Sequence, residues 1–242
     1  MRLDIRNVAA ACFIFLVSLC CGCGGQTSTN VMDSQPEPIP TASIPAPPPF
    51  DSRPKLVAFG DSFTAGWGFD DWRKNYPSLL QQDLDAARID LQVINRGRSG
   101  DTSAQGLARL DEALNVGDVR VFVVALGGND IFRNVPLDET RSSLDKIIRR
   151  AKAKGAKVLL CGYEVMDGLE NAKAVKQMYE DLARENSVEF LPSLLTGVQQ
   201  HPDLLLLDGV HPNEAGARVV EQNVWKALQP MLRDEPRKKL SS

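Results

Sequence analysis

Short apolar runs of strand length recur along the chain between residues 55 and 191. Several of these runs stay apolar without alternating with polar residues, which is typical of strands that are covered on both faces of a sheet. We predict strands over residues 55–59, 91–94, 119–126, 157–161 and 188–191.

Helical patterns lie between the apolar runs. Apolar residues recur there at a spacing of three and four, which gives each helix one apolar face. Gly155 stands where a C-cap glycine is expected, and Asn213 precedes the last pattern. Strand and helix therefore alternate, which predicts an α/β fold with a parallel sheet between helices and a site at the carboxyl ends of its strands. The predicted helices cover residues 76–84, 107–114, 144–151, 172–182 and 217–228.

Composition distinguishes the predicted α/β domain from the segments that precede and follow it. Residues 24–54 are rich in proline, with Ser, Thr and Ala between the prolines, and such a segment favours an extended, solvated linker. Residues 233–242 form a short charged tail that we expect to be frayed. The remaining residues, 55–232, are enough for one domain with a well-buried core.

The amino-terminal residues resemble a bacterial lipoprotein leader. An apolar run over residues 8–19 has the length of a signal peptide and is too short to span a bilayer. It ends in a cluster of cysteines, of which Cys23 follows the small residue Gly22 and is the preferred lipidation site, while Cys20 stays open. We predict a signal peptide over residues 1–23 and an extracytoplasmic lipoprotein held at the membrane by its lipid. A secreted or periplasmic protein is the alternative.

Charge and cysteine content exclude several classes. The net charge of -3 does not favour nucleic-acid binding, which uses a basic face. Four of the five cysteines lie in the first 23 residues, so the domain has no disulfide framework. Cys161 ends an apolar run, where a free cysteine is most often a small core residue, although a nucleophilic role is the alternative.

A candidate nucleophile follows the first predicted strand. Ser62 lies in Gly60-Asp61-Ser62-Phe63-Thr64, where a tight turn would expose its hydroxyl. The turn differs from the G-x-S-x-G elbow of the α/β-hydrolases, because Thr64 replaces the second glycine. A glycine turn with a helix-capping serine is the alternative interpretation.

The next two predicted strands lead into loops that could stabilise an oxyanion. Gly100 allows a close backbone approach, and Asp101 or Thr102 can cap the following helix. Asn129, after the third strand, could donate its side-chain amide to the same oxyanion. Considered singly, each is also compatible with a capped helix start or an ordinary Asx turn.

A candidate general base lies just before the last predicted helix. His211 follows Asp208 by three residues, so the carboxylate could bond one ring nitrogen and leave the other free as base. The chain has two histidines, and His201 stands in a polar stretch that we interpret as surface. A metal site around the two histidines, Asp203 and Asp208 is a further alternative, but the compact spacing of ligands is missing.

The four loops described above follow one another in an order that resembles the GDSL or SGNH hydrolases over residues 55–232. They are the segments around Ser62, Gly100, Asn129 and His211. The resemblance is greatest to bacterial thioesterases, arylesterases and lysophospholipases, above all over residues 99–110. It implies a flavodoxin-like three-layer sandwich with a five-stranded parallel sheet, a monomer, and neither a metal nor an organic cofactor. Phe63 stands where the family has leucine, and Ala125 where relatives often have an acidic residue.

The same resemblance assigns roles to the candidate residues. Ser62 would attack the carbonyl, His211 would accept its proton, and Asp208 would orient His211. The N–H groups of Ser62 and Gly100 and the amide of Asn129 would form the oxyanion hole. The predicted function is hydrolysis of an acyl ester or thioester.

Two other functions remain open. One is a carbohydrate or peptidoglycan O-deacetylase, and the other is a silent binding protein for lipid or glycan on the same fold. Substrate choice depends on the loop over residues 162–168, including Tyr163, which we expect to line the acyl pocket.

Overall fold

The computed structural model describes residues 51–163 and 171–238 of the chain. The predicted signal peptide, Cys23, nearly all of the predicted linker, and residues 164–168 of the predicted pocket loop lie outside these ranges. Within the described ranges, the helices are too short or too polar to cross a bilayer.

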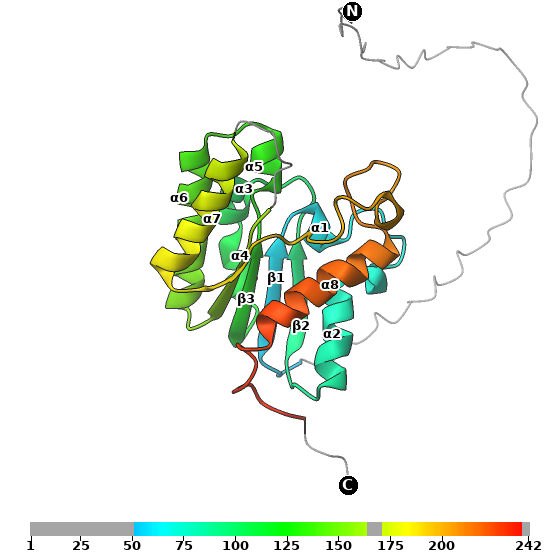
Figure 1. Cartoon of the computed structure of the whole chain (residues 1–242). Helices are drawn as coiled ribbons and strands as arrows, with labels where there is room; N and C mark the ends of the chain where they lie inside the picture. Colours follow the sequence, from blue (N-terminus) through cyan, green and yellow to red (C-terminus); the bar gives the residue numbers. More distant parts are fainter. Residues whose placement is uncertain (1–50, 164–170, 239–242) are drawn as a thin grey trace, which may run out of the picture. The chain divides into compact units, whose positions relative to one another are not determined.

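A five-stranded parallel sheet forms the centre of the domain, with strand order β2-β1-β3-β4-β5 (Figure 1). This order is that of flavodoxin-like folds, in which successive strands are added on opposite sides of β1, so that the strand order reverses between β1 and β3 and ligands bind at that point. The sheet confirms the predicted strands to within a few residues. The strands are β1 (Lys55–Gly60), β2 (Gln92–Gly97), β3 (Val119–Ala125), β4 (Lys157–Cys161) and β5 (Glu189–Leu191).

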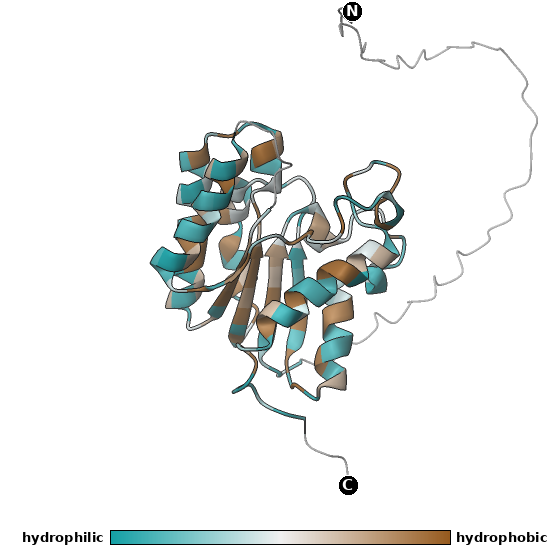
Figure 2. Ribbon diagram, viewed as in Figure 1, coloured by the Kyte–Doolittle hydropathy of each residue, from teal (hydrophilic) through white to brown (hydrophobic). Residues whose placement is uncertain are grey.

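Helices cover both faces of the sheet (Figure 1). On one side α2 (Tyr76–Ala86) packs against α8 (Glu214–Leu228). On the other side α6 (Leu137–Ala153) packs against α7 (Ala172–Asn186) and α3 (Ser103–Ala108). Figure 2 shows the apolar residues concentrated in the strands and the polar residues on the outward faces of the helices. The short helices are α1 (Ser62–Ala65), α4 (Leu110–Leu114) and α5 (Gly128–Phe132), with two 3-10 turns, η1 (Trp72–Lys74) and η2 (Pro202–Leu204).

The core explains why the strand patterns do not alternate. Every residue of β1 is buried, and so is every residue of β3 except Arg120, because helices cover both faces. Phe59 of β1 contacts Phe122 of β3, with ring centroids 5.3 Å apart. Burial of side chains of this size contributes about 1.5–3 kcal/mol each.

One predicted helix is divided in the structure. The apolar pattern over residues 107–114 predicted a continuous helix, but α3 ends at Ala108 and α4 begins at Leu110. Arg109 lies between them with its side chain buried against Asp101, 2.5 Å from the carboxylate, and over the ring of Phe59. The buried ion pair thus coincides with the break.

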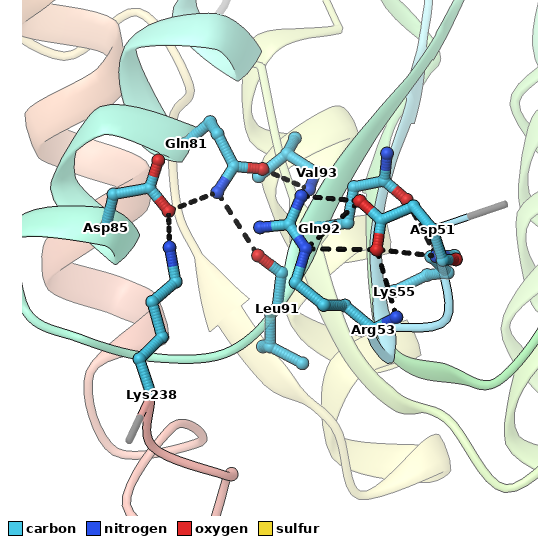
Figure 3. A network of polar contacts seen from close by, with 9 residues as sticks. All are labelled: Asp51, Arg53, Lys55, Gln81, Asp85, Leu91, Gln92, Val93 and Lys238. Carbon is cyan, nitrogen blue, oxygen red and sulfur yellow. Dashed lines mark hydrogen bonds and ion pairs between the residues drawn. The ribbon is translucent and has the colours of Figure 1, made fainter. Parts of the chain in front are cut away.

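Both ends of the described domain are fixed at the amino ends of the strands. Lys55 donates to Gln92, 2.7 Å away, and lies 3.8 Å from the carboxylate of Asp51 (Figure 3). At the other terminus, Lys238 forms an ion pair of 2.6 Å with Asp85 of α2 (Figure 3). The expectation of a frayed tail is therefore wrong for residues 233–238.

Candidate active site

The candidate residues lie at the edge of the sheet where the strands end. Ser62 follows β1, Gly100 follows β2, and Asn129 follows β3. His211 comes from the loop before α8, and Figure 1 shows this loop and α1 at the same end of the domain. Parallel strands bring the ends of distant segments together in this way.

Ser62, His211 and Asp208 form a chain of hydrogen bonds. Nε2 of His211 lies 2.8 Å from Oγ of Ser62. Nδ1 of the same ring lies 2.7 Å from Oδ2 of Asp208. With Nδ1 donating to the carboxylate, Nε2 is left as an acceptor that can take the serine proton.

Backbone hydrogen bonds connect the two ends of the loop that carries His211. The N–H of Leu206 donates to the carbonyl of His211 over 2.7 Å, and Leu205 bridges to Pro212 in antiparallel fashion. Asp208 stands at the tip and accepts from two backbone N–H groups, those of Val210 at 2.9 Å and His211 at 3.0 Å.

These bonds determine the charge of Asp208. The bond from the His211 N–H, followed by that from Val210 and the imidazole, lowers the pKa of Asp208 to about 2. The carboxylate is therefore ionised in the neutral pH range. An ionised Asp208 holds the imidazole in the tautomer that serves as base and stabilises the imidazolium once it forms.

The turn that carries Ser62 is held from behind by Asp61 and Tyr163. Asp61 is fully buried and caps α1 by accepting from the N–H of Phe63, 3.1 Å away. Tyr163 donates its hydroxyl to the other oxygen of Asp61, also over 3.1 Å. Ser62 is the first residue of α1, so its N–H has no partner within the helix and can donate outward.

Burial changes the titration of this pair. Removal of the carboxyl from water raises the pKa of Asp61 to about 7, against the opposing effect of its hydrogen bonds. Burial also raises the pKa of Tyr163, which keeps its hydroxyl protonated as a donor. Of the loop over residues 162–168 that was expected to line the acyl pocket, Tyr163 is buried behind the nucleophile turn, with its ring centroid 5.9 Å from that of Phe63. Tyr163 is not among the residues that line the pocket beside Ser62.

The loops that carry Gly100 and Asn129 are bonded to each other. Asn129 donates its side-chain amide to the carbonyl of Asp101 over 3.0 Å. Gly100 has a φ of 84°, a conformation that favours glycine, and its carbonyl accepts from Arg133. The expected cap of α3 is present, because Thr102 forms a capping box with Gln105.

Two buried carboxylates fix these loops. Asp130 accepts from the N–H and the hydroxyl of Ser103, at 2.7 Å and 2.5 Å, and from Thr140 at 3.2 Å. Asp101 pairs with Arg109, whose guanidinium also donates to the carbonyl of Gly60 over 3.0 Å. The sequence pattern did not indicate these roles, although both acidic residues stand beside glycine-rich turns.

The remaining candidates lie apart from this arrangement. His201 is exposed, directly precedes the short η2 turn and is not among the residues that line the pocket at Ser62 and His211. Cys161 is buried in β4, where burial raises the pKa of its thiol. Within residues 51–163 and 171–238, no cluster of His, Cys, Asp and Glu has the arrangement of a metal site.

A pocket opens beside Ser62 and His211. Its walls come from the nucleophile turn, the start of α2 and the first turns of α8, and they are mainly apolar. The lining residues are Ser62, Phe63, Gly66, Trp67, Phe69, Tyr76, His211, Pro212, Ala217 and Val220.

Comparison with known proteins now identifies the chain's family. Residues 58–219 match the model of the GDSL-like lipase/acylhydrolase family, which is more than half of the chain. The chain belongs to this family. It is an ester hydrolase, and the predicted family and fold are confirmed.

Relatives match this hydrolase over 73% of its length. Esterase TesA of Pseudomonas aeruginosa is 35% identical over 179 residues, which are 73% of this chain and 89% of the relative. Thioesterase 1/protease 1/lysophospholipase L1 of Escherichia coli K12 is 34% identical over 179 residues, which are 73% of this chain and 84% of the relative. The crystal structure of TesA matches with a TM-score of 0.71 at 34% identity and covers 74% of this chain and 99% of that one.

Proposed function

We propose that this GDSL hydrolase cleaves acyl esters and thioesters through Ser62, His211 and Asp208. The observation that carries the proposal is the continuous hydrogen-bonded chain from Oγ of Ser62 through His211 to Asp208. His211 takes the serine proton while Oγ bonds to the carbonyl carbon. The proton then passes to the departing oxygen or sulfur, and water releases the acyl group from Ser62 by the same steps.

The oxyanion of each tetrahedral intermediate requires donors opposite His211. The N–H groups of Ser62 and Gly100 and the second amide hydrogen of Asn129 supply them. An amide nitrogen carries two hydrogens, and one bond from Asn129 to Asp101 orients the other toward the substrate. Such preorganised donors lower the barrier because they need no rearrangement as charge develops.

The relatives named above and the apolar pocket beside Ser62 and His211 support this substrate class. We further propose that the enzyme acts outside the cytoplasm as a monomer, held at the membrane by lipid on Cys23. The leader-like apolar run and the proline-rich segment that follows it support this proposal.

The decisive experiment compares Ser62→Ala, His211→Gln and His201→Gln. Hydrolysis of a nitrophenyl ester should fall by about 10⁶ in Ser62→Ala, because the nucleophile is lost. His211→Gln should be comparably inactive, since Gln cannot accept the proton. His201→Gln is the matched control and should keep the wild-type rate.

Each variant should keep the circular dichroism spectrum of the wild type. A folded Ser62→Ala protein with wild-type turnover would exclude the mechanism. Loss of activity in His201→Gln with full activity in His211→Gln would show that the wrong histidine is assigned as base.

A further inference from the structure

Trp67 lies beside the candidate base with much of its side chain in solvent. It is 54% exposed, and its ring is tilted against the His211 imidazole with centroids 6.0 Å apart. Trp67 also lines the pocket beside Ser62, and aromatic side chains are common in the walls of small-molecule pockets. The mechanism above gives this side chain no role.

The backbone under Trp67 is constrained. Its N–H donates to the carbonyl of Ser62 over 3.1 Å. Gly66 and Gly68 on either side have φ values of 89° and 83°, which favour glycine. A Cβ on Gly68 would come within 2.4 Å of Leu206, so this turn packs against the loop that carries His211. The indole is therefore exposed on a backbone fixed to both the nucleophile and the base.

Proton transfer defines which part of the substrate faces Trp67. When the acyl–oxygen bond breaks, the departing oxygen takes the proton from Nε2 of His211, so it must lie within hydrogen-bond distance of that atom. The oxyanion faces Gly100 and Asn129 instead. Figure 1 shows α5, which carries Asn129, on one side of α1 and the loop before α8 on the other. The leaving group therefore departs on the side of Trp67.

We propose that the pocket formed by Trp67, Phe69 and Val220 binds the alcohol or thiol part of the substrate and selects an apolar chain there. This inference rests on the proposed function and adds a leaving-group specificity to it. The lining offers few partners to a sugar: the hydroxyl of Tyr76 is bound to Thr64 at 3.1 Å, and that of Ser62 is the nucleophile. Apolar walls discriminate between alcohols by chain length, because each buried methylene adds binding free energy.

Two series of esters test the proposal. In one, the acyl group is constant and the alcohol grows, from ethyl to butyl to hexyl acetate. In the other, the alcohol is constant and the acyl group grows, from ethyl acetate to ethyl butyrate to ethyl hexanoate. The readout is the ratio of kcat/KM between the longest and the shortest member of each series.

In the wild type, kcat/KM for hexyl acetate should be about tenfold that for ethyl acetate. Trp67→Ala should bring this ratio close to one and leave the ratio of the acyl series as in the wild type. Trp67→Phe should give an intermediate ratio. Trp72→Ala is the matched control, because Trp72 is 71% exposed in the same connection but does not line the pocket, and it should keep both wild-type ratios.

Three results would overturn the leaving-group assignment. They are a wild-type enzyme indifferent to alcohol length, a Trp67→Ala variant with an altered acyl series instead, and faster turnover of an acetylated sugar than of hexyl acetate. Each of these results counts only if the wild type hydrolyses the esters and Ser62→Ala does not. If the wild type hydrolyses none of these esters, the proposed function itself fails.

Discussion

Asn129 donates its side-chain amide to the carbonyl of Asp101, so its position depends on a residue that makes no contact with substrate in the proposed mechanism. Asp101 in turn is held by the buried guanidinium of Arg109. Asp61 and Tyr163 support Ser62 in the same way. At the scale of residues, Ser62 and Asn129 thus depend on buried neighbours that set their direction, whereas His211 is oriented by the exposed Asp208.

Replacement of Asn129 by alanine should lower kcat by about 10²–10³ and leave KM nearly unchanged, because the amide bonds the oxyanion more strongly than the ground-state carbonyl. Steady-state kinetics on a nitrophenyl ester measure both constants. Asn115→Ala, at the exposed end of α4, is the control and should keep wild-type kinetics. An unchanged kcat in Asn129→Ala would limit Asn129 to a structural role.

At the scale of elements, the contact between α2 and α8 contains a buried acid. The side chain of Glu221 on α8 is fully buried. Arg218 lies 3.2 Å from it and also 3.8 Å from Asp83 of α2, so one cation serves two carboxyl groups. Burial, followed by the hydrogen bond and charge of Asp83, raises the pKa of Glu221 from 4.5 to about 7.

A raised pKa makes the contact between α2 and α8 sensitive to pH. As pH rises from 4.5 to about 7, Glu221 ionises in the unfolded chain but stays protonated in the folded one, so the folded state loses stability. The loss is on the order of 3 kcal/mol, since one pKa unit corresponds to about 1.4 kcal/mol. Urea unfolding at pH 4.5 and pH 8 should therefore show a larger fall in unfolding free energy for the wild type than for Glu221→Gln.

Glu112→Gln is the matched control for this measurement. Glu112 is exposed on α4, with its side chain 67% accessible. This variant should follow the pH dependence of the wild type. If Glu221→Gln also follows the wild type, Glu221 is ionised in the folded protein and the contact tolerates its charge.

At the scale of the whole molecule, the described chain enters at the edge of the sheet opposite the candidate site (Figure 1). Asp51 and Lys238 both lie in polar contacts there (Figure 3). In the proposed lipoprotein, the proline-rich stretch that precedes Asp51 in the sequence would link the domain to the lipid.

We expect the mature protein to begin at a lipid-modified Cys23. Intact-mass analysis of membrane-extracted protein should show acylation at that residue. Cys23→Ala should move the protein to the soluble fraction or leave its leader uncut, whereas Cys20→Ala should remain in the membrane. A soluble protein with an unmodified amino terminus would favour simple secretion instead.

The sequence by itself determined the strands, most helices and the residues of the candidate site. Strands buried on both faces carry uninterrupted apolar runs, and this local signal identified β1, β3 and β4. The outer strands β2 and β5 are only partly buried and were located from shorter apolar stretches. Asp208 and His211 were recognisable as a pair because they stand three residues apart in one loop. Ser62, Gly100 and Asn129 were found because each follows a strand whose end could be located.

Tertiary structure alone decided which of these residues touch and what supports them. Ser62 and His211 are separated by 149 residues, and their 2.8 Å contact depends on strand order and on the packing of α8. The bond from Tyr163 to Asp61 spans 102 residues. The local patterns did not indicate that Trp67 lines the pocket or that Arg109 forms a buried ion pair with Asp101. Periodicity reports only which face of an element is apolar. It does not report which distant side chain meets that face once the sheet is assembled.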